Sequence, residues 1–202
     1  CGLQPFPEAE AVVRRRAAEL GCAVLPPYPA ESAVGWLPAD TPAFLRENFG
    51  LALRLCQAAG IVPAPERFRM PALPGRFEIV RQRPLVVLDA AHNRDSARRL
   101  RQALEARWPG RRFCIVLGVV EGKDAAGIFA ELLPAAAAFV LVELQTPRGS
   151  QHGALEELAR QSGTRWRLEA SPSANSLAGE ESLLFTGSFH TVALGKALYP
   201  AE

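Results

Sequence analysis

The chain has 202 residues, of which 49% are hydrophobic and 22% charged, and its net charge is +2. These values are typical of a globular protein, and so weak a net charge indicates no nucleic-acid partner. The four cysteines lack metal-ligand spacing, so we expect reduced thiols in a cytoplasmic protein and no metal site. No apolar run approaches the ~20 residues of a membrane helix, and we expect neither a membrane segment nor a signal peptide.

Residues 1–72 are predicted to form an incomplete α/β segment. Helices are expected at 7–20 and 41–59, where Pro and Gly stand at the expected ends, and a short strand at 22–25. The second helix is expected to bury an apolar face that includes Leu55. Two helices with one or two strands cannot cover both faces of a sheet, so this segment is interpreted as part of a larger domain.

From residue 77 onward, strand and helix patterns alternate. The predicted strands are 77–80, 85–88, 113–117, 138–142, 166–168 and 182–186, and the predicted helices are 94–107, 123–133, 154–161 and 189–198. Such alternation is typical of a mostly parallel, doubly wound, Rossmann-like sheet with right-handed crossovers.

Three polar residues, Asp89, His92 and Asn93, directly follow the apolar strand 85–88 and precede a helical pattern. In open α/β sheets, ligands bind where the carboxyl end of a strand meets the start of a helix. An aspartate there can accept hydrogen bonds from ribose hydroxyls, and we expect Asp89 to be an exposed crevice residue. Asp and Asn after a strand are also common turn formers and helix caps, and both interpretations stay open.

Other candidates follow the same logic. Arg76 carries a planar guanidinium suited to phosphate or carboxylate, or is a surface charge beside a Pro-Gly turn. Ser188 after Gly187 could form an anion-binding cup of backbone N–H groups, or an ordinary N-cap. Lys123 follows a glycine-rich turn, but the spacing and the following Asp exclude a P-loop.

Three segments together resemble signatures of the folylpolyglutamate synthase / dihydrofolate synthase family of the Mur ligase superfamily. They are Pro74-Gly75-Arg76-Phe77, Leu88-Asp89-Ala90-Ala91-His92-Asn93 and Gly187-Ser188-Phe189-His190-Thr191-Val192. Their order and spacing agree with the family over roughly residues 73–199. The resemblance implies a Mur ligase-like C-terminal (glutamate ligase) domain over 73–202. Residues 1–72 are then the C-terminal remnant of the central ATP-binding domain with its linker.

The resemblance also implies roles for individual residues. ATP binding is implied for Arg76, Asp89 and Asn93, and glutamate binding for His92 and Ser188. Further candidates are Arg148, His190 and Lys123. No residue of this chain is assigned to catalysis itself or to a metal. The chain departs from the family at Arg94, where proline is common, and between 168 and 182, where the family usually has a full helix.

The implied activity of the whole protein is that of an ATP-dependent carboxylate–amine ligase. Such an enzyme adds L-glutamate to folate through an acyl phosphate, and dihydrofolate synthase activity is open. ATP, Mg²⁺, glutamate and folate are the implied small molecules, with Mg²⁺ bound mainly by the ATP-binding domain. No GxxxxGK[ST] motif is present, so we expect these 202 residues alone to be inactive. The alternatives are a non-catalytic nucleotide- or partner-binding module and the C-terminal domain of another Mur-type ligase; the oligomeric state is open.

Overall fold

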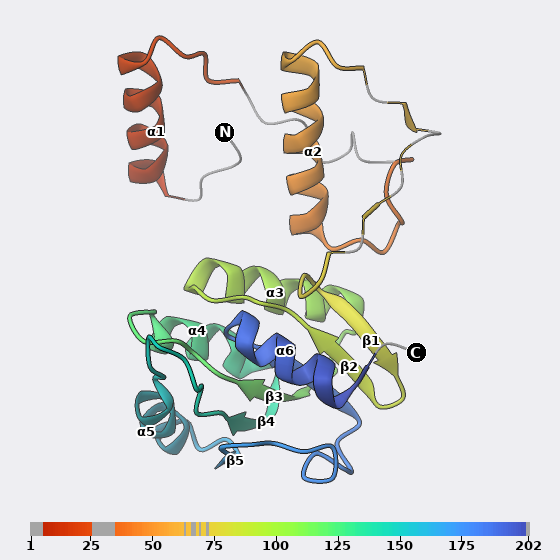
Figure 1. The fold of residues 1–202 in the computed structure, drawn as a ribbon, viewed down its shortest axis with the longest axis vertical. Helices are drawn as coiled ribbons and strands as arrows, with labels where there is room; N and C mark the ends of the chain where they lie inside the picture. The colour runs from red at the N-terminus through yellow and green to blue at the C-terminus, as the bar shows by residue number, and fades with distance from the viewer. Residues whose placement is uncertain are drawn as a thin grey trace. The chain divides into compact units, whose positions relative to one another are not determined.

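The computed structural model describes residues 6–25, 35–62, 64–65, 68, 70–71 and 73–200. The chain divides into two compact units, Cys1–Pro71 and Ala72–Glu202 (Figure 1). Within the described ranges, no helix is both long enough and apolar enough to cross a membrane.

The first unit contains two helices, α1 (Pro7–Glu19) and α2 (Ala43–Ala58), close to the predicted ranges. Of the α2 residues only Leu45 and Gly50 are buried, and the Leu55 side chain is 62% exposed, so the expected burial of that residue is wrong. Trp36, Phe49 and Phe68 form an aromatic cluster with ring centroids 4.9–5.8 Å apart.

The strand predicted at 22–25 is wrong. These residues have an extended or irregular backbone and pair with no strand in the described part of the unit. A strand is stable only when a neighbour completes its hydrogen bonds, and an apolar run of four residues does not supply that neighbour.

The second unit is built on a six-stranded sheet in the order β1-β2-β6-β3-β4-β5. The strands are β1 (Glu78–Gln82), β2 (Leu85–Leu88), β3 (Phe113–Leu117), β4 (Ala136–Leu141), β5 (Trp166–Leu168) and β6 (Ser182–Thr186). Every neighbouring pair is parallel except β1 with β2. The predicted α/β fold with a mostly parallel sheet is therefore confirmed.

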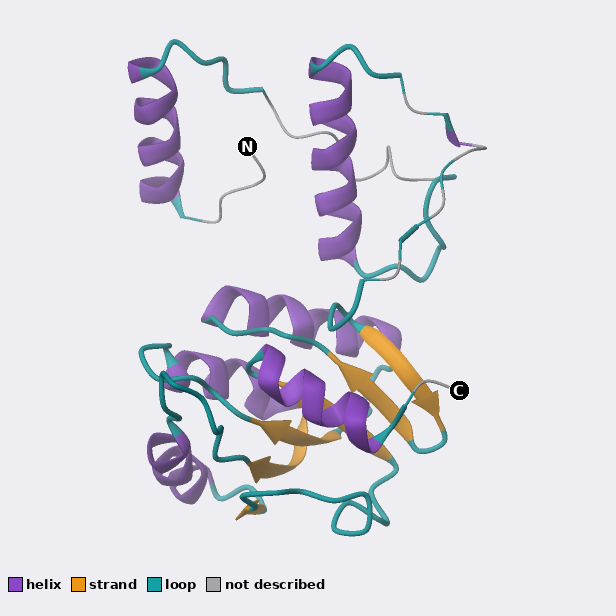
Figure 2. Ribbon diagram, viewed as in Figure 1, coloured by secondary structure: helices purple, strands orange, loops and turns teal. Residues whose placement is uncertain are grey.

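Helices cover both faces of this sheet (Figures 1 and 2). They are α3 (Arg94–Arg107), α4 (Ala125–Leu132), continued by a 3-10 turn (Leu133–Ala135), α5 (His152–Ser162) and α6 (Phe189–Leu198). α3, α4 and α5 pack side by side in that order, whereas α6 packs on β6 and β2. All residues of β2, β3 and β6 are buried, as expected for parallel strands covered on both faces.

The last strand, β6, lies between β2 and β3. The chain leaves β2 through α3 and enters β3 two positions further along the sheet, and β6 later takes the position between them. The order of strands along the sheet therefore departs from their order in the sequence at β2, β6 and β3. In folds of this kind, ligands bind in the crevice at the carboxyl ends of the strands where this happens.

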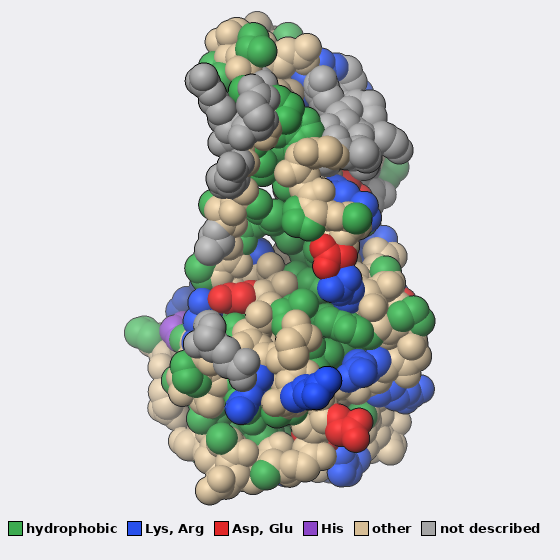
Figure 3. All heavy atoms as spheres, turned by 90° about the vertical axis from the view of Figure 1, so that its right-hand side faces the viewer, with side chains coloured by type: hydrophobic (Ala, Val, Ile, Leu, Met, Phe, Trp, Pro, Cys, Tyr) green, Lys and Arg blue, Asp and Glu red, His purple; other side chains and the backbone are tan. Residues whose placement is uncertain are grey.

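The edge strand β1 is short and carries charged side chains. It runs antiparallel to β2 with an irregularity between Ile79 and Arg81. Figure 3 shows Lys and Arg side chains gathered on the face of the second unit that carries β1, with fewer acidic side chains between them. Charge and a short irregular strand both oppose edge-to-edge pairing with another chain.

Two helical glycines offer a matched test of the packing. A Cβ on Gly195 of α6 would lie 2.6 Å from Leu88 Cδ2 and 2.7 Å from Phe185 Cγ, whereas a Cβ on Gly153 of α5 meets nothing within 4 Å. We expect Gly195→Ala to lower the free energy of unfolding by about 1–3 kcal/mol because the core is overpacked. Gly153→Ala should raise it by at most about 1 kcal/mol. Urea denaturation followed by tryptophan fluorescence measures both, and equal effects would contradict close α6–sheet packing.

Candidate functional site

The candidate site lies at the carboxyl edge of the sheet, where β2, β6 and β3 end and α3, α6 and α4 begin. The amino end of a helix exposes backbone N–H groups and carries a partial positive charge. Three such ends at one edge favour negatively charged ligands. The predicted residues of the loops after β2 and β6 lie at this edge.

Asp89 is the first residue after β2, and its side chain is only 5% exposed. Its Oδ2 accepts a hydrogen bond from the Phe77 backbone N–H at 2.8 Å, and its Oδ1 accepts one from the Ala91 N–H at 2.9 Å. The expectation of an exposed crevice residue is therefore wrong: the carboxylate is buried, and backbone donors occupy both of its oxygens.

The segment that Asp89 holds is the turn before β1. Gly75 has a φ of +66° and Phe77 a φ of +50°, a conformation that costs a bulky residue energy. A second backbone bond, from Ala90 N–H to the Gly75 carbonyl at 2.8 Å, joins the same two segments. The Phe77 ring is buried and stacks on Trp108 at 5.9 Å. This turn is thus fixed against the loop after β2 by hydrogen bonds and by ring packing.

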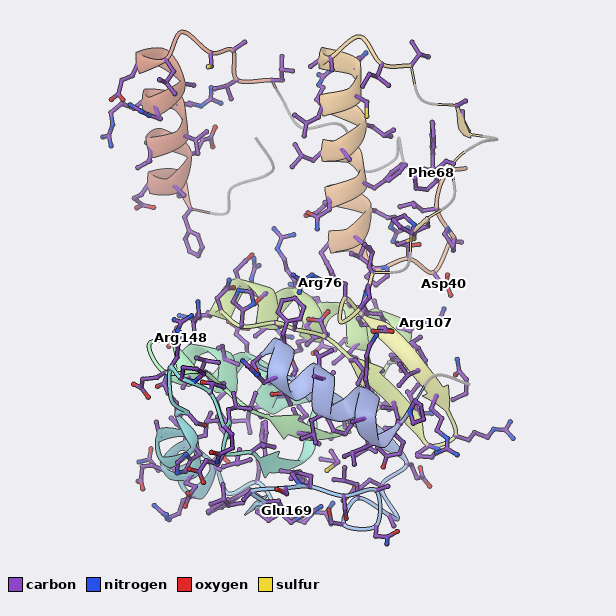
Figure 4. All side chains as sticks on the ribbon, viewed as in Figure 1. Asp40, Phe68, Arg76, Arg107, Arg148 and Glu169 are labelled. Atoms are coloured by element: carbon purple, nitrogen blue, oxygen red, sulfur yellow. The ribbon has the colours of Figure 1, made fainter. Side chains whose placement is uncertain are left out.

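Arg76 lies at the centre of this turn and is partly exposed. Its guanidinium carbon is 5.0 Å from the ring centroid of Phe189, the first residue of α6, a favourable cation–π distance (Figure 4). The Arg76 charge also acts on the Asp89 carboxylate. The structure therefore brings together three features that lie far apart in the sequence: Arg76, Asp89 and the start of α6.

Burial raises the pKa of Asp89 to about 6 from its ordinary 3.8. The two backbone hydrogen bonds and the nearby charges of Arg76 and His92 act in the opposite direction, but desolvation of the carboxylate outweighs them. This group therefore titrates in a range close to neutral pH.

His92 and Asn93 occupy the same loop. The His92 Nδ1 lies 2.8 Å from the Ala90 carbonyl, and because a carbonyl only accepts, Nδ1 carries the proton and Nε2 is the acceptor of the neutral ring. Asn93 is the N-cap of α3: its Oδ1 accepts from the Ser96 N–H at 2.8 Å, and the Ser96 hydroxyl is 3.1 Å from the Asn93 N–H. This capping box leaves the Asn93 side-chain NH₂ as the donor available to a ligand.

Ser188 is the N-cap of α6 and is buried, with an exposed fraction of 4%. Its Oγ accepts from the Thr191 N–H at 3.1 Å and lies 2.8 Å from the Thr191 hydroxyl, which bonds the Gly118 carbonyl at 3.2 Å. A Cβ on Gly187 would lie 2.6 Å from that same carbonyl oxygen, so only glycine fits there. The loops after β6 and β3 are thus closely packed. Ser188 contributes to this packing through its hydrogen bonds with Thr191.

The remaining three candidate residues take no part in the hydrogen bonds described above. His190 is exposed on the first turn of α6, and Arg148 is exposed in the loop between β4 and α5 (Figure 4). Lys123 precedes the N-cap Asp124, whose Oδ1 accepts from the Gly127 N–H at 2.8 Å, so this turn caps α4.

Sequence reasoning missed Thr191 and Gln151, which join loops across the edge. The Gln151 Nε2 donates to the Lys123 carbonyl at 2.6 Å and to the Val120 carbonyl at 3.2 Å. Thr191 lies in the first turn of α6 and Gln151 directly precedes α5, and only their polar side chains at those helix starts could have indicated them.

Comparisons with known proteins agree with the fold and with the family resemblance. The family model of the Mur ligase, glutamate ligase domain matches residues 75–188, which is more than half of the chain. The chain therefore belongs to the Mur ligase family, in its glutamate ligase domain. The resemblance found in the three sequence segments is confirmed.

More particular relatives are dihydrofolate synthase/folylpolyglutamate synthases. The protein of that name from Escherichia coli is 31% identical over 161 residues, which are 75% of this chain and 37% of the relative. The one from Bacillus subtilis is 26% identical over 169 residues, 79% of this chain and 35% of the relative. The chain thus spans little more than a third of the length of these curated relatives.

Solved structures give the same result. A bifunctional folylpolyglutamate synthase/dihydrofolate synthase with Mn, AMPPNP and L-glutamate bound has a TM-score of 0.64 and 28% identity, covering 75% of this chain and 38% of that one. The Mycobacterium tuberculosis folylpolyglutamate synthase complexed with ADP has a TM-score of 0.78 and 23% identity, covering 100% of this chain and 54% of that one. At that identity the second match supports the fold alone.

The Asp89 carboxylate predicts a pH dependence of stability. Its folded pKa, about 6, lies above its unfolded value, so its contribution is full below about pH 4 and is lost as the pH rises through 6. A rise of this size in the pKa corresponds to about 3 kcal/mol. We expect the difference in unfolding free energy between wild type and Asp89→Asn to fall by about that amount from pH 4 to pH 7. Urea titrations at several pH values measure it, and a difference independent of pH would contradict the burial of an ionised Asp89.

Proposed function

We propose that the chain is the C-terminal part of an ATP-dependent folylpolyglutamate synthase, which joins L-glutamate to folate through an acyl phosphate. The observation that carries the proposal is the placement of Arg76 and Asp89 at the start of α6, at the carboxyl edge of a Mur ligase glutamate ligase domain. The curated relatives that the chain matches are named dihydrofolate synthase/folylpolyglutamate synthase.

Arg76 and the helix starts supply the positive charge of the proposed ATP site. A guanidinium binds phosphate oxygens bidentately, and backbone N–H groups at helix amino ends add neutral donors. Asp89 acts on this site by holding the turn that carries Arg76, because its oxygens bind the Phe77 and Ala91 N–H groups. The Asn93 NH₂ group faces solvent beside it and adds a further donor to the nucleotide.

The loop after β2 and the start of α6 also provide groups for glutamate. The His92 Nε2 can accept a proton or hydrogen bond from the glutamate amino group, whose lone pair attacks the activated carboxyl. The amino end of α6, which Ser188 caps, suits a glutamate carboxylate. Holding two substrates in the reactive arrangement accounts for a large part of the rate in such a reaction.

Divalent metal is proposed to bind outside these residues. Among the parts of the chain that the structure describes, no group of three or more His, Cys, Asp or Glu side chains could hold a metal ion. The described residues therefore form no preassembled group of ligands for Mg²⁺, and we assign the metal, with the P-loop, to the ATP-binding domain of which residues 1–72 would form the last part.

An activity assay tests whether the ATP-binding domain is required for ligation. We expect these 202 residues to release phosphate only at background in the presence of ATP, Mg²⁺, a reduced folate and glutamate, because the GxxxxGK[ST] motif is absent. A protein extended upstream to include an ATP-binding domain should ligate glutamate, and dihydropteroate in the same assay tests the dihydrofolate synthase activity. Turnover by the 202-residue chain, or an extended protein that binds ATP but ligates nothing, would contradict the proposal.

The role of Arg76 is tested in the extended protein. Arg76→Gln should raise the KM for ATP by roughly 10- to 100-fold, since a hydrogen bond to a charged group contributes about 1.5–3 kcal/mol. The matched control is Arg160→Gln on α5, an exposed arginine paired only with Glu157 in the described structure. Steady-state kinetics measure both variants, and a change in melting temperature without a change in KM would assign Arg76 to packing on Phe189.

A further inference from the structure

A second hollow lies at the opposite, amino edge of the sheet. It has a volume of about 640 Å³, within the range of small-molecule sites. The β1–β2 hairpin, the segment before β3, the loop before β6 and the end of α6 line it. None of the residues that form the proposed ATP and glutamate site contributes to this hollow.

Three arginines, Arg81, Arg83 and Arg111, are among the residues that line this hollow. Arg83 is exposed and forms no hydrogen bond or ion pair with any residue that the structure describes. Arg111 bonds only the Ser182 hydroxyl, at 2.9 Å, and has no carboxylate partner in the same described ranges. The charges of Arg83 and Arg111, which have no carboxylate partner among the described residues, favour an anionic ligand in this hollow.

The acidic side chains of the hollow do not cancel this charge. Glu180 is already paired with Arg165, which lies outside the hollow, at 3.0 Å. Glu181 is the one remaining carboxylate among the lining residues, and it is exposed. Figure 3 shows the same excess of Lys and Arg over Asp and Glu on the face that carries β1.

The hollow also has an apolar wall. Pro84 and Ala178 supply its accessible surface, because Leu177 and Tyr199, which also line the hollow, are almost fully buried. The Tyr199 ring packs 6.0 Å from the Phe185 ring of the core, so this wall is fixed by the sheet. A rigid apolar wall next to cationic groups suits a ligand with a flat apolar body and an acidic group.

We propose that this hollow is a second binding site, which takes a small aromatic carboxylate. Its carboxylate binds Arg83 and Arg111, and its ring lies against Pro84 and Ala178. The site is independent of the proposed ligase function, because it lies at the other edge of the sheet and within the second unit alone.

Isophthalate, a flat aromatic dicarboxylate, is the probe, and its neutral analogue isophthalamide is the control ligand. We expect isophthalate to shift the backbone amide NMR signals of Gln82 and Gly179 in the ¹⁵N-labelled 202-residue chain, and isophthalamide to bind at least roughly tenfold more weakly. Pyrophosphate is an anion without an aromatic ring, so it tests whether charge alone is enough for binding. It should also bind more weakly than isophthalate. Equal binding of either control ligand, shifts confined to Asn93 and Ser188, or no shifts at about 20 mM isophthalate would overturn the proposal.

Three variants test the charges in both directions. Arg83→Gln should raise the Kd for isophthalate about tenfold, whereas Glu181→Gln should lower it about two- to threefold, because a repelling carboxylate is removed. The matched control is Arg112→Gln: this arginine is exposed and adjacent to Arg111 but does not line the hollow. Damaged folding could not explain a tighter binding of isophthalate by the Glu181→Gln variant. An unchanged Kd in Arg83→Gln, or a loss of affinity in Glu181→Gln, would overturn the site.

Discussion

The hydrogen bonds of the buried Asp89 carboxylate determine how the second unit presents its candidate site. Asp89 joins the turn at Phe77 to the loop after β2, two segments that otherwise share one backbone bond. Taking a carboxylate out of water is costly, and the raised pKa shows that two N–H donors only partly offset that cost. The buried carboxylate lies where it holds the turn that carries Arg76 next to α6. A neutral Asn at this position would remove the cost of burying a charge but would leave one acceptor oxygen for the two N–H groups.

Much of the fold could be predicted from the sequence because its signals are local. Runs of three to five apolar residues predict strands buried on both faces, and β2, β3 and β6 contain such runs. Helix ends follow from short polar residues and glycines, as at Asn93 and Ser188. At both positions a helix cap and a ligand-binding residue are compatible interpretations. The cap residue lies at the helix amino end, which is also where a ligand would bind.

The rest depends on contacts that no local pattern contains. The antiparallel pairing of β1 and the place of β6 between β2 and β3 are set by long-range packing. The burial of Asp89 follows from its bond to Phe77, twelve residues earlier, and the joining of two loops follows from the bond between Thr191 and Gly118, 73 residues apart. The polar sequence after β2 indicated where a site could lie but could not show which polar atoms the fold itself would use.

The two edges of the sheet differ in the chemistry that their backbones can supply. At the carboxyl edge helices begin, so backbone N–H groups supply donors for anions and few charged side chains are needed beside Arg76. At the amino edge helices end, and their free carbonyls repel anions, as at Tyr199 after α6. An anion can be bound there only if side chains supply the positive charge. The guanidiniums of Arg83 and Arg111, without carboxylate partners in the described structure, are the groups that meet this requirement.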